Sequence, residues 1–293
     1  MLEELCRRLV ATLSTLTQEF SIILVDDASP DKPWSLMQTL GKQDTRIKAI
    51  RLCRNFGQHS ALTAGIDYAY ARWYVIMDCD LQDAPEDIAA LYKKAVEGHH
   101  VVTAYRAKEG HDLGKRALSF LFYKMFQTLS GVHLDPNVGN FRVFSHAVAE
   151  GFRGIRERAR FVPASFEWMG FEQVFVEVPH HNRAEGRSSY SLRKLLTLAI
   201  DTVLAHSQVP LKFVVGAGIA MSLFSFVAAI IVFGRALFFG YDVDGWASLF
   251  VASMFLGSVQ IALLGIVGIY VGRTFEETKR RPLYIVGEKL NLD

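Results

Sequence analysis

Residues 73–83 read Trp-Tyr-Val-Ile-Met-Asp-Cys-Asp-Leu-Gln-Asp, a continuous apolar run that leads into three acidic residues. A run of this kind is typical of a strand that is covered on both faces of a sheet. Other apolar runs precede and follow it, at 20–25, 47–52 and 101–104. Helical patterns separate these runs, near 33–41, 59–71 and 86–97. The alternation predicts an α/β fold, with a parallel sheet and helices on both of its faces.

Acidic and polar residues follow three of these predicted strands at the point where each strand ends. Asp26 and Asp27 follow the first run, 54–58 follows the second, and Asp78 and Asp80 follow the run quoted above. Each cluster alone is compatible with a turn that caps a helix. Ligands of open α/β sheets bind at the carboxyl ends of strands, so the joint occurrence of the clusters favours a binding site.

Asp78 and Asp80 are the candidate metal ligands. Neighbouring carboxylates repel one another, and their arrangement costs stability unless a cation compensates the charge. Mg²⁺ is commonly bound by one or two carboxylates together with phosphate oxygens. We therefore expect Mg²⁺ or Mn²⁺ at this pair, where the ion would stabilise the charge that develops on a departing phosphate group.

The composition fits a globular head joined to apolar segments, because 51% of the 293 residues are hydrophobic and 21% are charged. A net charge of +2 argues against bulk binding of nucleic acid. Cys6, Cys53 and Cys79 have neither the number nor the spacing of a disulfide framework or a zinc site. We therefore expect a reduced, cytosolic location for the head.

Two long uncharged stretches occur near the end of the chain, at Phe213–Phe233 and Trp246–Val271. Each exceeds the roughly 18–20 apolar residues that cross a bilayer core. The link between them carries Asp242 and Asp244. Basic residues flank the opposite ends, at Lys212, Arg273, Lys279, Arg280 and Arg281. The positive-inside rule then predicts a multi-pass protein of the inner (plasma) membrane with its head in the cytoplasm.

Two basic, apolar-rich stretches at 113–130 and 191–206 are interpreted as amphipathic helices that lie on membrane lipids. For the first of them, a helix that faces the core of the head is a strong alternative. The predicted organisation is a head at 1–190, a juxtamembrane helix at 191–209, a two-helix membrane hairpin at 210–272 and a cytoplasmic tail at 273–293. Packing within the membrane would also allow a homo-oligomer.

Six segments, in this order, resemble the motifs of family 2 glycosyltransferases with the GT-A fold. They are 25–31 (Val-Asp-Asp-Ala-Ser-Pro-Asp), 54–58 (Arg-Asn-Phe-Gly-Gln), 77–83 (Met-Asp-Cys-Asp-Leu-Gln-Asp), 139–142 (Gly-Asn-Phe-Arg), 183–190 (Arg-Ala-Glu-Gly-Arg-Ser-Ser-Tyr) and 280–286 (Arg-Arg-Pro-Leu-Tyr-Ile-Val). Their order and spacing are similar to the polyprenyl-phosphate branch, which includes dolichol-phosphate mannose synthases and bacterial undecaprenyl-phosphate glycosyltransferases. The resemblance implies a Rossmann-like domain with a mixed, mostly parallel sheet and flanking helices. It also implies transfer of a sugar from a UDP- or GDP-linked nucleotide sugar to undecaprenyl or dolichyl phosphate, with a divalent metal and with inversion.

The resemblance also implies roles for individual residues. It places catalysis at Asp78, Asp80, Gln82 and Arg142. It places substrate binding at Asp26, Asp27, Arg54, Asn55, Gly57, Asn140, Arg183 and Ser188. Asp80 is expected to be the direct metal ligand, Asp27 to contact the nucleotide, and Gln82 to face the donor sugar. The loop that carries Arg183 and Ser188 is expected to close over a phosphate, to which arginine can donate two hydrogen bonds.

The sequence departs from the family pattern in two respects. The family begins with a central strand, whereas this sequence starts inside the helix that follows it, so that either the start lies upstream or the strand is missing. Many relatives carry Asp and Lys where Asn140 and Ser189 stand, and an asparagine cannot act as a base. Two other functions stay open: a processive polysaccharide synthase, whose Gln-x-x-Arg-Trp motif this sequence lacks, and a catalytically silent membrane scaffold.

Overall fold

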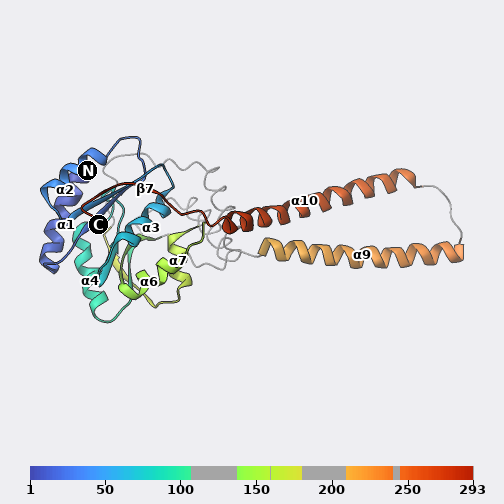
Figure 1. Ribbon diagram of the computed structural model, residues 1–293. Coiled ribbons are helices and arrows are strands. Elements are labelled where there is room, and N and C mark those ends of the chain that lie inside the picture. The colour runs from blue at the N-terminus through green and yellow to red at the C-terminus, as the bar shows by residue number, and fades with distance from the viewer. Residues whose placement is uncertain (107–136, 159, 180–208, 240–244, 293) are drawn as a thin grey trace. The chain divides into compact units, whose positions relative to one another are not determined.

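The computed structural model describes residues 1–106, 137–158, 160–179, 209–239 and 245–292. They belong to two compact units (Figure 1). The first unit contains the described residues up to 179 together with 281–292, and the second contains 209–280. The C-terminal residues therefore fold with the N-terminal part of the chain.

Two sheets form the centre of the first unit. The first has the strand order β1-β2-β7, with β1 at Ile22–Asp26, β2 at Ile47–Leu52 and β7 at Val286–Leu290. β1 and β2 are parallel, and β7 runs antiparallel to β2. The last strand of the chain thus completes a sheet that the first two strands begin.

The second sheet has the order β3-β5-β4-β6 and consists of β3 (Trp73–Ile76), β4 (Val101–Arg106), β5 (Val138–Ser145) and β6 (Gln173–Val178). β5 lies antiparallel between β3 and β4, and β6 is parallel to β4. Three of the five pairings between described strands are antiparallel, so the prediction of a mostly parallel sheet is wrong. The prediction rested on the strand–helix repeat before residue 104, whereas β5 and β7 follow it and join as antiparallel partners, which need no crossover helix.

Helices flank the sheets, as the sequence predicts. The elements before residue 100 are α1 (Leu2–Leu16), α2 (Trp34–Gln43), α3 (Gln58–Tyr68), the 3₁₀ turn η1 (Pro85–Asp87) and α4 (Ile88–Val96). Among the described residues that follow, α6 (His146–Gly154) and α7 (Val162–Trp168) are helical. The alternation of strands and helices is therefore confirmed, and the fold is a mixed α/β fold.

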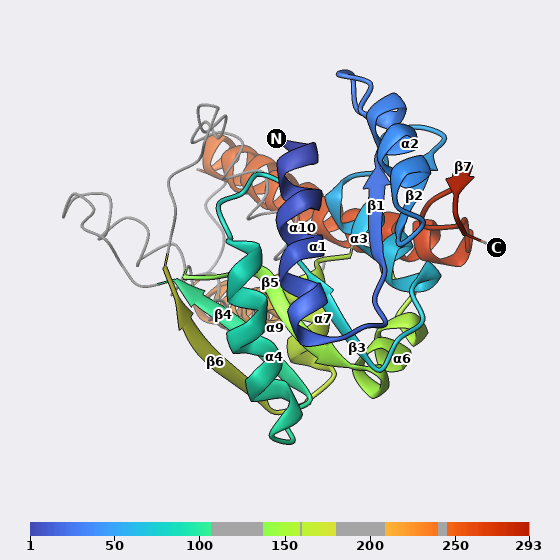
Figure 2. The same ribbon diagram turned by 90° about the vertical axis from the view of Figure 1, so that its left-hand side faces the viewer.

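Alternate residues of each strand face opposite sides of the sheet, which explains why both sides bury apolar side chains. In β1, Ile22 and Leu24 pack into the core shared with α1 and α2. Ile23 and Val25 pack on the other side, beside Ala64 of α3. The second sheet is covered in the same way, with α4 next to α1 on one side (Figure 2) and α6 against β3 and β5.

Two long helices, α9 (Val209–Phe239) and α10 (Trp246–Thr278), make up the described part of the second unit. The stretch Ala252–Thr278 is long and apolar enough to cross a membrane, and a window of 18 residues within it has a mean hydropathy of 2.1. Many of its large apolar side chains are exposed, including Ile261 at 73% and Leu264 at 72%. In the described part of α9 the apolar stretch is shorter, at Leu211–Val227, so a second span is not confirmed.

The predicted amphipathic helices at 113–130 and 191–206 lie outside the described residues. The predicted tail at 273–293 does not form a separate segment. Its first residues continue α10, and its later residues form β7 within the first unit. This strand has a direct bearing on the candidate site, because it pairs with β2 beside the first acidic cluster.

Candidate active site

Asp26 ends β1, and only 2% of its surface is exposed. Its Oδ1 accepts a hydrogen bond from the backbone N of Ser29 at 2.9 Å. Arg51, its register partner on β2, places Nε 3.6 Å from Oδ2. Glu288 of β7 binds Arg51 at 2.9 Å and accepts a hydrogen bond from Trp34 Nε1 at 3.0 Å. The C-terminal strand thus helps to hold the cation that faces Asp26.

Asp27 connects the first polar cluster to the second. Its Oδ1 accepts a hydrogen bond from the backbone N of Phe56 and its Oδ2 from that of Gly57, both at 2.8 Å. Gly57 precedes α3 with a φ of 94°, a conformation that glycine adopts far more readily than other residues. The structure therefore shows Asp27 holding the start of α3, which the sequence does not predict, and its contact with a nucleotide stays a prediction.

Arg54 and Asn55 lie on the surface, beside the segment that Asp27 holds. The guanidinium of Arg54 stacks over the ring of Phe56, with its carbon 4.3 Å from the ring centroid. Stacking of this kind orients a guanidinium while its N–H groups stay in the plane. The geometry is compatible with the predicted role of both residues in binding a substrate.

Asp78 connects the second polar cluster to the third. Gln58, the first residue of α3, donates a hydrogen bond from Nε2 to Asp78 Oδ1 at 2.9 Å. Both acidic clusters therefore approach the start of α3, Asp27 through the backbone and Asp78 through a side chain. This agrees with the expectation that residues at the carboxyl ends of these strands gather at one place.

Asp80 closes a tight turn with the residues that follow it. Its Oδ1 accepts a hydrogen bond from the backbone N of Gln82 at 3.2 Å, and Leu81 between them has a φ of 59°. A leucine in the left-handed region is strained, and such strain is concentrated at functional sites. The turn fixes the backbone of Asp80 and Gln82, the predicted metal ligand and the residue predicted to face the sugar.

Arg142 lies within β5, in register with Ile76 of β3, and is 2% exposed. Its Nε donates to the carbonyl oxygen of Asn140 at 3.2 Å, and its Nη2 donates to that of Gly139 at 2.9 Å. The guanidinium carbon lies 4.5 Å from the centroid of the Phe166 ring. Arg142 therefore pairs with the residue that lies two positions before Asp78 in the sequence.

Arg142 carries its charge in a buried position. Burial lowers the pKa of Arg142 to about 10, so the guanidinium remains protonated at neutral pH. The contacts between described residues give this cation carbonyl oxygens and an aromatic ring, but no carboxylate. Burying a charge is costly, and the carbonyl oxygens of Gly139 and Asn140 are the described hydrogen-bond acceptors that offset this cost.

Two of the predicted substrate-binding residues, Arg183 and Ser188, lie outside the described residues. Asn140 is half-buried and contributes its carbonyl oxygen to Arg142. The structure therefore joins Asp27, the 56–58 segment and Asp78 through hydrogen bonds. Gln58 is the member of this group for which the sequence predicts no role, although it belongs to the motif at 54–58.

The chain is similar to known proteins, and this similarity shows its family. Residues 2–152 match the model of glycosyl transferase family 2. The chain is 37% identical over 293 residues to an uncharacterized glycosyltransferase of Synechocystis sp. (strain ATCC 27184 / PCC 6803 / Kazusa), which aligns with all of this chain over 92% of its own length. The chain belongs to glycosyl transferase family 2. It is therefore an enzyme, a glycosyltransferase, as its motifs imply.

Other relatives of this glycosyltransferase carry names that state an acceptor. It is 34% identical to the bactoprenol glucosyl transferase of Shigella phage SfV, over 92% of this chain and 88% of the relative. It is 31% identical to the undecaprenyl-phosphate 4-deoxy-4-formamido-L-arabinose transferase of Pseudomonas aeruginosa (strain LESB58), over 97% of this chain and 85% of the relative. Both alignments thus extend through nearly all of the chain.

The side chains at the Asp78–Asp80 segment of this glycosyltransferase suit a hard divalent ion. Carboxylate oxygens are the ligands that Mg²⁺ prefers, and Mg²⁺ usually keeps several waters or phosphate oxygens as well. Within the described ranges, no group of three or more His, Cys, Asp and Glu side chains gathers to hold a metal. Asp78 and Asp80 would hold such an ion through their carboxylate oxygens.

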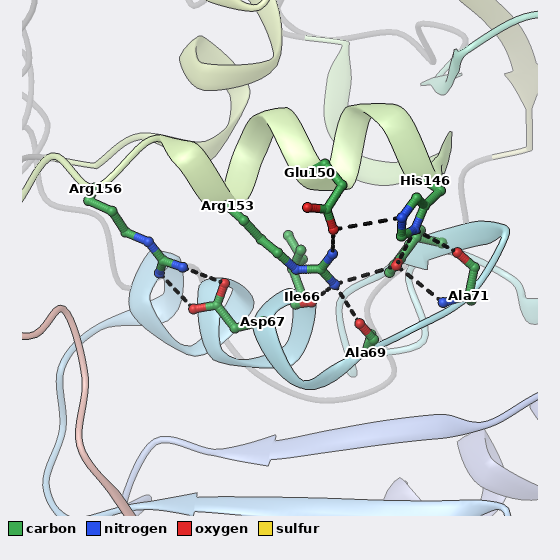
Figure 3. Close-up of polar contacts among 9 residues, drawn as sticks. Ile66, Asp67, Ala69, Ala71, His146, Glu150, Arg153 and Arg156 are labelled. Carbon is green, nitrogen blue, oxygen red and sulfur yellow. Dashed lines mark hydrogen bonds and ion pairs between the residues drawn. The ribbon is translucent and has the colours of Figure 1, made fainter.

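The other end of α3 is held by α6 (Figure 3). Arg153 donates hydrogen bonds to the carbonyl oxygens of Ile66 and Ala69, at 2.7 and 2.5 Å, and pairs with Glu150. These carbonyls end α3 and have no partner within the helix, so a cation stabilises them. Arg153 therefore caps the end of α3 that lies opposite Gln58.

Asp67 ties α3 to the C-terminal segment. Its carboxylate pairs with Arg156 at 2.7 Å and accepts a hydrogen bond from the hydroxyl of Tyr284 at 2.8 Å. Burial and the neighbouring Asp67 raise the pKa of Tyr284, so its hydroxyl keeps its proton at physiological pH. Residues that precede β7 therefore pack against the helix that carries Gln58.

His59, the second residue of α3, should make the stability of the protein depend on pH. Burial and then the positive charge of Arg160 lower the pKa of His59, so the folded protein resists its protonation. In the unfolded chain the pKa is about 6.5, so the unfolded state binds more protons as the pH falls below that value. This contribution lowers the free energy of unfolding as the pH decreases from 7 to 5.

We expect His59→Gln to reduce that pH dependence. Glutamine does not titrate in this range, so the melting temperature of the variant should fall less between pH 7 and pH 5 than that of the wild type. Thermal unfolding of both proteins in the same detergent, at pH 7, 6 and 5, measures the difference. Parallel curves for the two proteins would contradict the assignment of this titration to His59.

Proposed function

We propose that this glycosyltransferase moves a sugar from a UDP- or GDP-linked nucleotide sugar to the phosphate of a polyprenyl phosphate, at the cytoplasmic face of a membrane. The product would be a lipid-linked monosaccharide for modification of the cell envelope or of a glycan. The proposal rests mainly on the group that Asp27, the 56–58 segment and Asp78 form by hydrogen bonds. This group contains Asp27, which the family resemblance relates to the nucleotide, and Asp78, which it relates to the metal.

The acceptor is proposed from the relatives and from the chemistry of the site. Two relatives are named for transfer involving bactoprenol and undecaprenyl phosphate. A phosphate is anionic at neutral pH, so its oxygen can attack without a strong general base. Asn140, which cannot act as a base, is compatible with such an acceptor.

The proposed reaction is a single displacement. An oxygen of the acceptor phosphate forms a bond to the anomeric carbon of the sugar while the bond from that carbon to the diphosphate oxygen breaks. The nucleoside diphosphate leaves with the bonding electrons, and attack from the opposite side inverts the anomeric centre. The protein must therefore align two phosphate-bearing substrates and stabilise the departing charge.

Each residue of the site has its own role in the proposed reaction. Asp78 and Asp80 would hold Mg²⁺ or Mn²⁺, which when bound stabilises the charge on the departing diphosphate. Arg142 would donate hydrogen bonds to a phosphate from its buried position, where interactions with an anion are stronger than in water. Gln82 would face the sugar. The remaining substrate-binding positions proposed are Asp26, Asp27, Arg54, Asn55, Gly57, Asn140, Arg183 and Ser188.

A membrane location is proposed from α10 and the charges beside it. The exposed apolar stretch Ala252–Thr278 is what a bilayer would cover, and basic residues follow at 279–281. We propose that α9 forms a second span, so that the start of α9 and the end of α10 lie on the cytoplasmic side. Such an enzyme would meet its lipid acceptor at the membrane surface, with membrane lipids and other copies of the chain as partners.

The test uses the full chain purified in detergent. It is incubated with undecaprenyl phosphate, Mg²⁺ or Mn²⁺, and a panel of UDP- and GDP-linked sugars, and the lipid extract is analysed by mass spectrometry. We expect one donor to yield a polyprenyl phosphate heavier by a single sugar residue, and chelation by EDTA to abolish its formation.

Controls distinguish the alternatives. Dephosphorylated undecaprenol should yield no product, because it lacks the attacking oxygen. A polymer in place of a single added sugar would favour a processive synthase. If no donor yields a product although a thermal unfolding transition shows that the protein is folded, the result would favour a scaffold without catalytic activity and would refute the proposed function.

A further inference from the structure

We propose that Gln58 is a positioning residue, which orients the carboxylate of Asp78 for the metal ion. The proposal deepens the metal assignment within the proposed function and rests on it. It gives a role to a side chain that touches neither sugar nor phosphate in the proposed reaction. Gln58 Nε2 lies 2.9 Å from Asp78 Oδ1, across 20 residues of sequence.

Hydrogen bonds of the two preceding residues hold the backbone at Gln58 in place. Gln58 is the first residue of α3, and the two preceding backbone N–H groups, of Phe56 and Gly57, both donate to Asp27 at 2.8 Å. N–H groups at the start of a helix lack partners within the helix and favour a carboxylate. Asp27 therefore anchors the point from which the amide of Gln58 reaches Asp78.

A neutral donor suits this position better than a cation. A hydrogen bond from an amide selects one orientation of the Asp78 carboxylate and leaves its negative charge in place for a metal. A lysine or arginine there would form an ion pair and compete with the metal for the carboxylate. Residues that orient metal ligands in this way commonly change metal affinity about 10–100-fold when they are substituted.

The variant Gln58→Ala removes the amide, and Gln173→Ala is a matched control. Gln173 of β6 also donates from Nε2 to a carboxylate, Glu167, at 3.2 Å, and it has no contact with the candidate site among those described. Both glutamines thus lose one hydrogen bond to a carboxylate, but only Gln58 contacts a proposed metal ligand. Gln58→Asn, which retains the amide on a shorter side chain, tests whether reach matters.

The experiment titrates each purified full-length protein with Mn²⁺ alone and follows the free ion by electron paramagnetic resonance. We expect Gln58→Ala to raise the dissociation constant for Mn²⁺ about tenfold, Gln58→Asn to raise it to a similar extent, and Gln173→Ala to leave it unchanged. Asp80→Ala should abolish binding. Thermal unfolding checks that the variants are folded, because a purely structural role would lower the melting temperature without a change in the affinity for Mn²⁺.

Transfer kinetics provide a second measurement. In Gln58→Ala the Mn²⁺ concentration for half-maximal rate should rise about tenfold, while the rate at saturating Mn²⁺ stays close to that of the wild type. Wild-type affinity for Mn²⁺ in a folded Gln58→Ala protein, or the absence of Mn²⁺ binding by the wild type, would overturn the inference. Weakened Mn²⁺ binding together with no sugar transfer from any donor would refute the proposed function and leave the role of Gln58 intact.

Discussion

Replacing Asp80 with alanine should lower the rate of sugar transfer by about a thousandfold or more while the protein remains folded. A metal ion contributes several kcal/mol to the stabilisation of a departing diphosphate, and each 1.36 kcal/mol corresponds to a tenfold change in rate. The carboxylate also accepts the hydrogen bond from Gln82 N, at 3.2 Å. Loss of one such bond costs about 1 kcal/mol, which a folded domain usually tolerates.

The measurement is the initial rate of lipid-linked sugar formation at several Mn²⁺ concentrations. Asp80→Asn is the finer variant, because it retains the shape of the side chain but removes the charge, and we expect a loss that high Mn²⁺ restores only in part. Glu19→Ala, which removes an exposed acidic side chain before β1, should transfer sugar at the wild-type rate. Unchanged transfer by Asp80→Ala would show that the metal assignment is wrong.

Arg142→Met should lower transfer about 100- to 1,000-fold, which is the loss typical when one preorganised donor to a developing anion is removed. Its effect on stability should be small in comparison. Methionine fills much of the same space against Phe166, and the variant removes a buried charge for which the described contacts provide no carboxylate. Two hydrogen bonds to carbonyl oxygens are lost, so we expect the free energy of unfolding to change by less than about 2 kcal/mol.

Arg153→Met is the matched control for this prediction. Arg153 also donates to backbone carbonyls and lies near an aromatic ring, that of Tyr74, but it belongs to α6 and caps the end of α3 instead of occupying the middle of a sheet. We expect it to lose about 1–3 kcal/mol of stability and to retain most of its transfer rate per folded molecule. If Arg142→Met instead unfolds the protein, while its folded fraction transfers sugar normally, Arg142 serves packing and not the reaction.

The sequence by itself determined the part of the fold that depends on local patterns. Apolar runs and helical periodicity predicted four strands and the helices between them, because both signals depend on neighbouring residues. The same runs located Asp26, Asp27, Asp78 and Asp80 at strand ends, and the family motifs identified the class of enzyme. The apolar stretch within α10 was equally visible, since length and composition decide whether a helix can cross a membrane.

Only the tertiary structure decided how distant segments join. β5 and β7 enter antiparallel, which the strand–helix repeat before residue 104 does not predict. Asp27 binds the start of α3 across 29 and 30 residues, Gln58 reaches Asp78 across 20, and Trp34 meets Glu288 across 254. Composition and periodicity carry no information about such pairs, because each exists only once the sheets have brought the ends of their strands together. The burial of Arg142 has the same origin, since a central place in a sheet depends on the strands that pair on either side.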